Sequence, residues 1–311
     1  MAAPRPVLPG QFIFVTRRCT QRQFLLRPDD DTNQTLLYCL ALAAHRANMD
    51  VVFPSAMSNH HHTALYDREG RHPEFTEHFH KLTARSVNAL RGRWENLWAS
   101  EPPSVVVLAD RAAVMDKVVY AATNPVKDGL VALVRHWPGV NGLADLLADR
   151  TITVRRPRHF FDPDGDLPEV VTLRYVIPEE LGDPAAFRAE LRERVAAVEA
   201  ACAAARARTG QRVLGRRGVR LQSWRGQPRT REPRRGIRPR VAGGSRWARI
   251  EALQRDRVFV DRYRHARQLW LAGFAVTFPP GTYWLRRFAP VTVAAVASSP
   301  PAGGTATGPP R

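Results

Sequence analysis

The sequence predicts an α+β or α/β core in the first half of the chain and a basic extension in the second half. Hydrophobic residues make up 44% of the 311 residues, which is enough to bury a real core. Segments with strand periodicity and helix periodicity alternate, with several short connections, up to about residue 149. Beyond that point the composition changes, and residues 210–244 are rich in glycine, proline and arginine without apolar periodicity.

The elements of the first half follow from periodicity and from capping residues. Residues 11–17 alternate polar and apolar side chains, as a strand does. Asp29 and its neighbours are typical of a helix start, and Asp110 is a suitable N-cap for a later helix. Pro54 places its strand at an edge or a bend. Strands are therefore predicted at 11–17, 50–56, 59–66 and 104–108, and helices at 29–48, 73–90 and 111–123.

The second half is predicted to contain a hairpin, two helices and two segments without regular structure. A DPDGD turn at 162–166 joins strands at 151–155 and 170–177. Helices are expected at 184–208 and 247–271. The predicted organisation is a core domain at 9–149, a hairpin and helix extension at 150–209, an Arg-rich flexible arm at 210–244, a helical segment at 245–295 and a disordered tail at 296–311.

The positive charge of the chain lies almost entirely in the second half. Residues 1–149 hold 16 Lys and Arg against 15 Asp and Glu, whereas the whole chain carries a net charge of +18. Residues 206–249 contain 15 arginines and a single acid, Glu232. A segment with this density of positive charge binds anions or stays solvated. Nucleic acid is the commonest partner of such a block, because each neutralised phosphate releases counterions, and we expect it here over an inert solvated tail.

Other features exclude several classes of protein. No apolar run approaches the roughly 18 residues of a membrane span. The first ten residues lack the apolar region of a secretory signal. Three cysteines lie far apart without a CxxC pair, so a disulfide scaffold is not expected. These features predict a cytoplasmic, DNA-associated protein without a membrane partner.

Three consecutive histidines form the first candidate site. On a strand, side chains two positions apart share a face, so His60 and His62 are predicted to point together at one site. Two imidazoles supply half of a divalent metal site. The alternative is a chance cluster of exposed histidines, and the three residues by themselves leave both interpretations open.

Tyr120 marks the second candidate site. The helix around it places Val118 and its apolar neighbours on one side, while Tyr120 shares another side with Asp116, Lys117 and Asn124. Asn124 could supply an oxygen ligand beside the Tyr hydroxyl. Its alternative role is that of a C-cap, because Pro125 disfavours helical conformation in the residue before it.

Together these motifs resemble a known family. The text MSNHHH at 57–62 followed by YAATNPVKDGLV at 120–131 is similar to the "MpNHhH" and "YxxxNPvragLv" motifs of HUH single-strand transposases of the IS200/IS605 type, and closest to REP-associated tyrosine transposases. The segments PGQFIFVTRR and QRQFLL also resemble the opening strand of that family. The resemblance covers roughly residues 9–142.

The resemblance implies a fold, a reaction and a partner. The fold is a ferredoxin-like α+β domain with a central antiparallel sheet and flanking helices. Tyr120 would match the nucleophile, and His60, His62 and Asn124 the ligands of a Mg²⁺ or Mn²⁺ ion. The reaction would cleave and rejoin single-stranded or hairpin DNA through a 5′-phosphotyrosine intermediate. A homodimer is possible, since the family includes paired and single-subunit forms.

Two departures from the family motifs keep other functions open. His61 occupies a position that is normally bulky, apolar and core-facing, so it either weakens packing or offers the metal another ligand. The segment between the motifs lacks the usual family text. Alternatives are thus a domesticated DNA-binding protein that no longer cuts, and a hydrolase that uses the histidines without a covalent step. Lys117 and Lys127 are expected to be solvated rather than bound to phosphate, and Trp224 and Trp247 to pack rather than to stack on bases.

Overall fold

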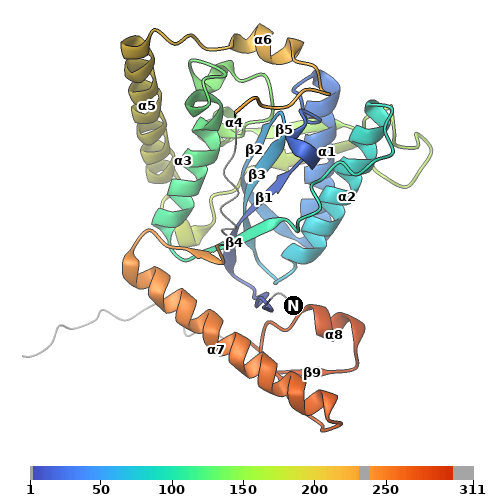
Figure 1. The fold of residues 1–311 in the computed structure, drawn as a ribbon. Coiled ribbons are helices and arrows are strands. Elements are labelled where there is room, and N and C mark those ends of the chain that lie inside the picture. Colours follow the sequence, from blue (N-terminus) through green and yellow to red (C-terminus); the bar gives the residue numbers. More distant parts are fainter. Residues whose placement is uncertain (1–2, 231–238, 297–311) are drawn as a thin grey trace, which may run out of the picture. The chain divides into compact units, whose positions relative to one another are not determined.

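The computed structural model describes residues 3–230 and 239–296 (Figure 1). The chain divides into two compact units, one formed by Pro9–Gln254 and the other by Met1–Leu8 together with Arg255–Arg311. Among the described helices, none combines the length and the apolar character that crossing a bilayer demands.

The larger unit is built on a five-stranded sheet with the strand order β2-β3-β1-β4-β7. Its first six elements are β1 (Gln11–Arg18), α1 (Asp30–Ala47), β2 (Met49–Met57), β3 (His60–Asp67), α2 (His72–Leu90) and β4 (Ser104–Leu108). Strands β1 to β4 pair antiparallel throughout. This βαββαβ order with β1 and β3 in the centre is the ferredoxin-like arrangement, so the predicted α+β fold class is confirmed.

Local chemistry sets the limits of these elements where the sequence predicted them. Asp29 caps α1, its Oδ1 accepting a hydrogen bond from the Thr32 backbone N–H at 2.8 Å. Asn48 ends the helix in the left-handed conformation, with φ of 50°. Pro54 lies on β2, which is the edge strand, and the register of β2 shifts between Val51 and Phe53. The edge assignment is therefore confirmed.

Helix α3 (Arg111–Lys127) follows β4 and extends further than predicted. The expected end near Thr123, with Asn124 as a C-cap, is wrong. Pro125 lies inside the last turn, where its ring removes one intrahelical hydrogen bond without ending the helix. The Asn124 carbonyl still accepts a hydrogen bond from the Asp128 N–H at 3.0 Å. Asn124 consequently keeps a helical position four residues after Tyr120.

The helices form layers on both faces of the sheet (Figure 1). Helices α1 and α2 cover one face, and α3 covers the other with α5 (Pro184–Thr209) packed on its outer side. The predicted hairpin is formed by β5 (Thr151–Arg155) and β6 (Val170–Arg174), which pair antiparallel beside α1. Short helices complete this unit at Thr20–Arg22 (η1), Val134–His136 (η2), Leu143–Leu147 (α4) and Glu179–Leu181 (η3).

Residues 210–244 contain regular structure, contrary to the prediction of a flexible arm. They form α6 (Gly215–Leu221) and β7 (Val241–Ala242), which pairs parallel with β4. The Asp110 carboxylate accepts hydrogen bonds from the N–H groups of Gly244 and Ser245 at 3.0 and 3.2 Å. A Cβ on Gly244 would lie 2.3 Å from Ala112, so only glycine permits this approach. Residues 231–238 of the predicted arm lie outside the described residues.

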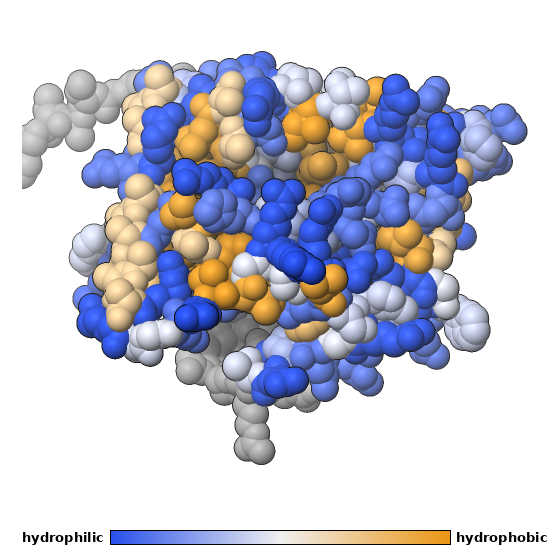
Figure 2. Space-filling model, turned by 90° about the horizontal axis from the view of Figure 1, so that it is seen from above, coloured by the Kyte–Doolittle hydropathy of each residue, from blue (hydrophilic) through white to orange (hydrophobic). Residues whose placement is uncertain are grey.

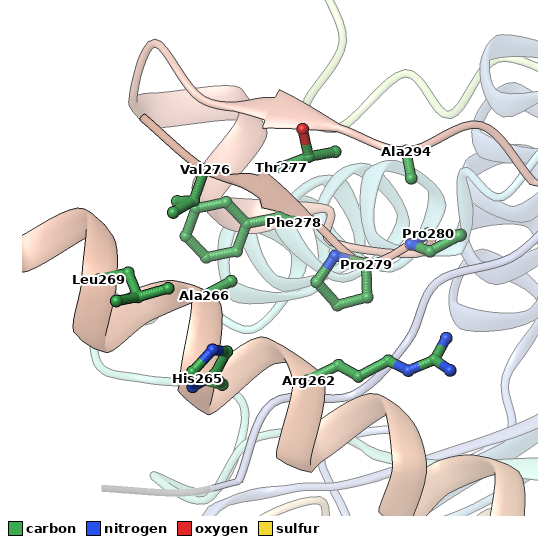
Figure 3. A pocket seen from close by; sticks show the side chains of 10 residues that line it. All are labelled: Arg262, His265, Ala266, Leu269, Val276, Thr277, Phe278, Pro279, Pro280 and Ala294. Atoms are coloured by element: carbon green, nitrogen blue, oxygen red, sulfur yellow. The ribbon is translucent and has the colours of Figure 1, made fainter. Parts of the chain in front are cut away.

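The predicted helix at 247–271 is confirmed as α7 (Arg246–Leu271), most of which belongs to the smaller unit. That unit also has β8 (Thr277–Phe278), α8 (Trp284–Phe288) and β9 (Thr292–Val293). A hollow of about 390 Å³ lies between α7 and the β8 segment, lined by apolar side chains together with Arg262, His265 and Thr277 (Figure 3). Of the predicted tail, residues 297–311 lie outside the described residues. The predicted domain limits themselves stay predictions.

Candidate active site

Two histidines of β3 and one asparagine of α3 converge on the face of the sheet that α3 covers. The Nδ2 atom of Asn124 lies 3.3 Å from Nε2 of His60 and 3.2 Å from Nε2 of His62. The two imidazole ring centroids are 4.8 Å apart. The period of two along β3 and the last turn of α3 bring these side chains together, although they lie far apart in the sequence.

Hydrogen bonds orient both imidazoles through Nδ1. Oδ1 of Asn59 lies 2.7 Å from Nδ1 of His60, and Oγ1 of Thr16 lies 2.8 Å from Nδ1 of His62. Asn59 donates its Nδ2–H to the Arg22 carbonyl, so its Oδ1 is the acceptor for His60. A proton on Nδ1 leaves the Nε2 lone pair pointing at Asn124. This arrangement is typical of metal-binding histidines, whose second nitrogen is held by a neighbouring group.

The environment keeps these imidazoles neutral near pH 7. Burial, together with the positive charge of Arg18, lowers the pKa of His60 to about 4. Burial, the neighbouring histidines and Lys117 hold the pKa of His62 well below its usual range. Neutral imidazoles offer lone pairs to a cation, whereas imidazolium groups repel it.

Tyr120 lies beside this cluster, one helical turn before Asn124. The residue is 41% exposed, and its ring centroid is 5.3 Å from that of His62. The ammonium groups of Lys117 and Lys127 lie 5.7 and 5.4 Å from the centroid of the same ring. An exposed phenol between two cations, next to a cluster of neutral ligands, is well placed to meet a phosphate group.

His61 points to the opposite face of the sheet. Its Nε2 lies 2.9 Å from Nε2 of His80 on α2, and its ring packs against Phe79 and Trp98. The possibility that His61 supplies an alternative metal ligand beside His60 and His62 is therefore wrong, because alternate side chains of a strand face opposite ways. The contact with His80 gives the buried His61 ring a polar partner.

The donor set at this site fits a divalent cation. Two imidazole nitrogens each lie within 3.3 Å of the same amide group. Neighbouring ligands in an octahedral shell of about 2.1 Å radius are about 3 Å apart, and half a turn of the Asn124 amide would exchange Nδ2 for Oδ1. No group of three or more His, Cys, Asp or Glu that could hold a metal occurs within residues 3–230 and 239–296. A cation at this site would therefore depend on the amide as its third protein ligand.

Several residues of the site escaped the sequence analysis. Thr16 contacts His62 only because β1 and β3 pair in a register that the sequence does not display. Asn59 could have been found, because it directly precedes His60. Lys117 and Lys127, which the sequence analysis did name, stand three residues before and seven residues after Tyr120, and this spacing places all three on one helical face. Lys127 is exposed and Lys117 partly buried, so their expected solvation stays a prediction.

The buried histidines predict acid sensitivity. The pKa values of His60 and His61 fall to about 4 and about 3, and those of His62 and His80 lie well below the usual range, in each case mainly because of burial. In the unfolded chain these imidazoles take up protons near pH 6.5. Their contribution to the free energy of unfolding is therefore fully present above that pH and is lost as the pH falls through the pKa values of the folded state. Each imidazole contributes up to about 1.4 kcal/mol per pH unit. Urea unfolding in EDTA should show a lower stability at pH 5 than at pH 7, and equal stabilities would contradict the burial of neutral rings.

Comparisons with known proteins give distant likenesses. No protein-family model matches the chain, and no curated protein matches its sequence. The chain is similar to the solved structure of a REP-associated tyrosine transposase bound to a REP hairpin, with 17% identity and a TM-score of 0.38 over 58% of this chain and 95% of that one. It is also similar to a presumed transposase from Deinococcus radiodurans R1, with 18% identity and a TM-score of 0.27 over 34% of this chain and 85% of that one. Both likenesses are too distant to assign a function, which must rest on the residues of this chain.

Proposed function

We propose that this protein is a metal-dependent transposase that cleaves and rejoins single-stranded DNA through a tyrosine–DNA bond. The observation that supports this most strongly is the position of His62. Its ring lies beside the Tyr120 ring, and its Nε2 lies 3.2 Å from the Asn124 amide. The nucleophile and the ligand set implied by two separate motifs thus meet at one point.

The proposed reaction exchanges one phosphodiester bond for another. Oη of Tyr120 attacks the scissile phosphorus, a Tyr O–P bond forms, and the P–O3′ bond breaks. The leaving 3′ oxygen takes up a proton, and the phenol gives up its own, so the step needs no oxidant and no ATP. A free 3′-OH can attack the 5′-phosphotyrosine in the reverse sense, which rejoins strands.

His60, His62 and Asn124 would hold the Mg²⁺ or Mn²⁺ ion in this proposal. When bound, the ion supplies a Lewis acid that polarises the scissile phosphate. Neutral imidazoles, fixed by Asn59 and Thr16, present their Nε2 lone pairs without rearrangement. The protein thereby orients its ligands before DNA arrives.

Lys117 and Lys127 are proposed to hold the phosphate beside Tyr120. Replacing either with glutamine removes a positive charge near the attacked group, so we expect adduct formation to slow by about tenfold for each. Mn²⁺ affinity should stay within twofold, because neither lysine is a proposed ligand. Lys81, the remaining lysine of the chain, is exposed on α2 and gives the matched control Lys81→Gln. Equal rates for all three variants would contradict this role.

The test of the proposed function is the formation of a covalent adduct. Purified protein is incubated with labelled single-stranded hairpin DNA from the flanks of its own gene and with Mn²⁺ or Mg²⁺, then separated on a denaturing protein gel. A labelled, metal-dependent protein band is expected. Cleavage without a band would instead indicate a hydrolase, and binding of the same hairpins without cleavage would indicate a DNA-binding protein that no longer cuts.

A further inference from the structure

An arginine-rich segment, residues 212–230, crosses the larger unit between the parts of the chain that carry the candidate active site. We propose that this segment, called the Arg strap below, is the surface along which single-stranded DNA is held on its way to Tyr120. The inference rests on the proposed function and adds the path of the DNA to it. It concerns a part of the chain outside the family resemblance.

One end of the Arg strap is fixed just beyond α3. The Leu214 N–H donates to the Gly129 carbonyl at 3.0 Å, and the Gly215 N–H donates to the Leu130 carbonyl at 2.9 Å. Gly129 lies two residues after the end of α3 and five residues after Asn124. Val219 is fully buried in the core of the unit, so α6 is held in place rather than merely tethered.

The other end of the Arg strap is fixed to the loop after β1. The Gly226 carbonyl accepts from the Phe24 N–H at 2.9 Å, and the Thr230 carbonyl accepts from Nη1 of Arg22 at 2.7 Å. The Arg22 carbonyl in turn accepts a hydrogen bond from Asn59, the residue that orients His60. The strap therefore begins beside the helix that carries Asn124. It ends in contact with Arg22, which contacts Asn59, the residue that positions His60.

The side chains of the strap suit a polyanion. Residues 210–230 contain no acid, and their arginines are Arg212, Arg216, Arg217, Arg220, Arg225 and Arg229. Arg220 is paired with Asp30, whereas the other five are exposed, and no ion pair of theirs is seen among residues 3–230 and 239–296. Hydrophilic side chains gather in the middle of the face seen in Figure 2, with apolar patches between them. The phosphates of a nucleic-acid strand can pair with several exposed guanidinium groups that one segment carries.

Apolar side chains among these arginines favour a single strand over a duplex. Leu214 and Leu221 are 46% and 71% exposed. A single strand can lay the faces of its unpaired bases on such side chains while its phosphates meet the arginines, whereas a duplex hides its base faces. Trp224 is partly buried against the core, with Arg225 over its ring at 4.6 Å, so it supports the strap as a packing residue, as predicted. The same prediction is wrong for Trp247, which is 77% exposed.

The test measures binding of a fluorescent oligo(dT) 20-mer in EDTA, where no cleavage occurs, as a function of salt concentration. Replacing two exposed arginines of α6, Arg216→Gln with Arg217→Gln, should weaken binding by about tenfold at 0.1 M salt. The slope of log K against log salt should become shallower by about 1.4, since each single-strand phosphate contact contributes about 0.7. A second pair, Arg225→Gln with Arg229→Gln, should show the same loss of affinity and the same change in slope.

The matched control removes two exposed arginines elsewhere, Arg46→Gln with Arg192→Gln. Arg46 lies sixteen residues beyond Asp30 along α1, about 24 Å away at 1.5 Å per residue, and Arg192 is seventeen residues before the end of α5. The control should bind within twofold of the unaltered protein with the same slope. Equal weakening of the control and the strap variants, or tighter binding of oligo(U) than of oligo(dT), would overturn the proposal. Because no covalent step enters this assay, a failure of the strand-cleavage chemistry would leave its result unchanged.

Discussion

Tyr120→Phe should abolish the covalent protein–DNA adduct and lower metal-dependent strand cleavage at least a thousandfold, to the background of the assay. The substitution removes only the attacking oxygen, and a nucleophile that forms the intermediate has no substitute within the site. The ring stays beside His62 and the two lysines, so DNA binding and Mn²⁺ affinity should remain within about twofold. Quantitative gel analysis of labelled hairpin DNA measures both products.

Loss of activity in this variant should not result from a folding defect. Tyr120 is 41% exposed, so the midpoint of thermal unfolding should change little. Cleavage that persists together with an adduct would contradict the assignment of Tyr120 and show that another residue is the nucleophile. Cleavage that persists without any adduct would favour a hydrolytic reaction at the same histidines.

His62→Ala should reduce Mn²⁺ affinity by about a hundredfold or more and cleavage to a similar extent. His62 is the ring that faces both Asn124 and Tyr120, and a site with three protein ligands retains little affinity with two. Titration followed by the electron paramagnetic resonance signal of free Mn²⁺ measures the affinity directly, without DNA. His60→Ala should show the same loss.

His136→Ala provides the control for this pair, because His136 is an exposed histidine of the same unit. It should leave both Mn²⁺ affinity and cleavage within twofold. His62 is buried and stacks on Phe14, so the folded fraction of each variant has to be measured beside the titration. Unchanged Mn²⁺ affinity in a folded His62 variant would contradict the proposed ligand set, even if cleavage were lost.

Local signals in the sequence predicted much of the fold and the proximity of the candidate site residues. Asp29 and Asp110 cap the helices they were expected to cap, since N-capping depends only on the next three residues. The period of two placed His60 and His62 on one face, and the spacing of four placed Asn124 beside Tyr120. That these two pairs meet followed only from the family resemblance.

Features that depend on contacts distant in sequence escaped prediction. Residues 210–244 lack apolar periodicity, yet β7 pairs with β4 and the Asp110 carboxylate binds the N–H groups at Gly244 and Ser245. Composition alone cannot reveal a short strand that is held by one carboxylate and one neighbouring strand. In the same way, the role of His61 on β3 depends on His80, which lies on helix α2.

The most direct measurement of the central claim is mass spectrometry of the covalent product. Protein incubated with Mn²⁺ and hairpin DNA is digested with protease and nuclease, and the peptide that carries a nucleotide is sequenced by fragmentation. The proposed reaction predicts a single modified peptide with a 5′-phosphonucleotide on Oη of Tyr120, absent from the Tyr120→Phe protein. A nucleotide attached to any other side chain, or cleaved DNA without a modified peptide, would contradict it.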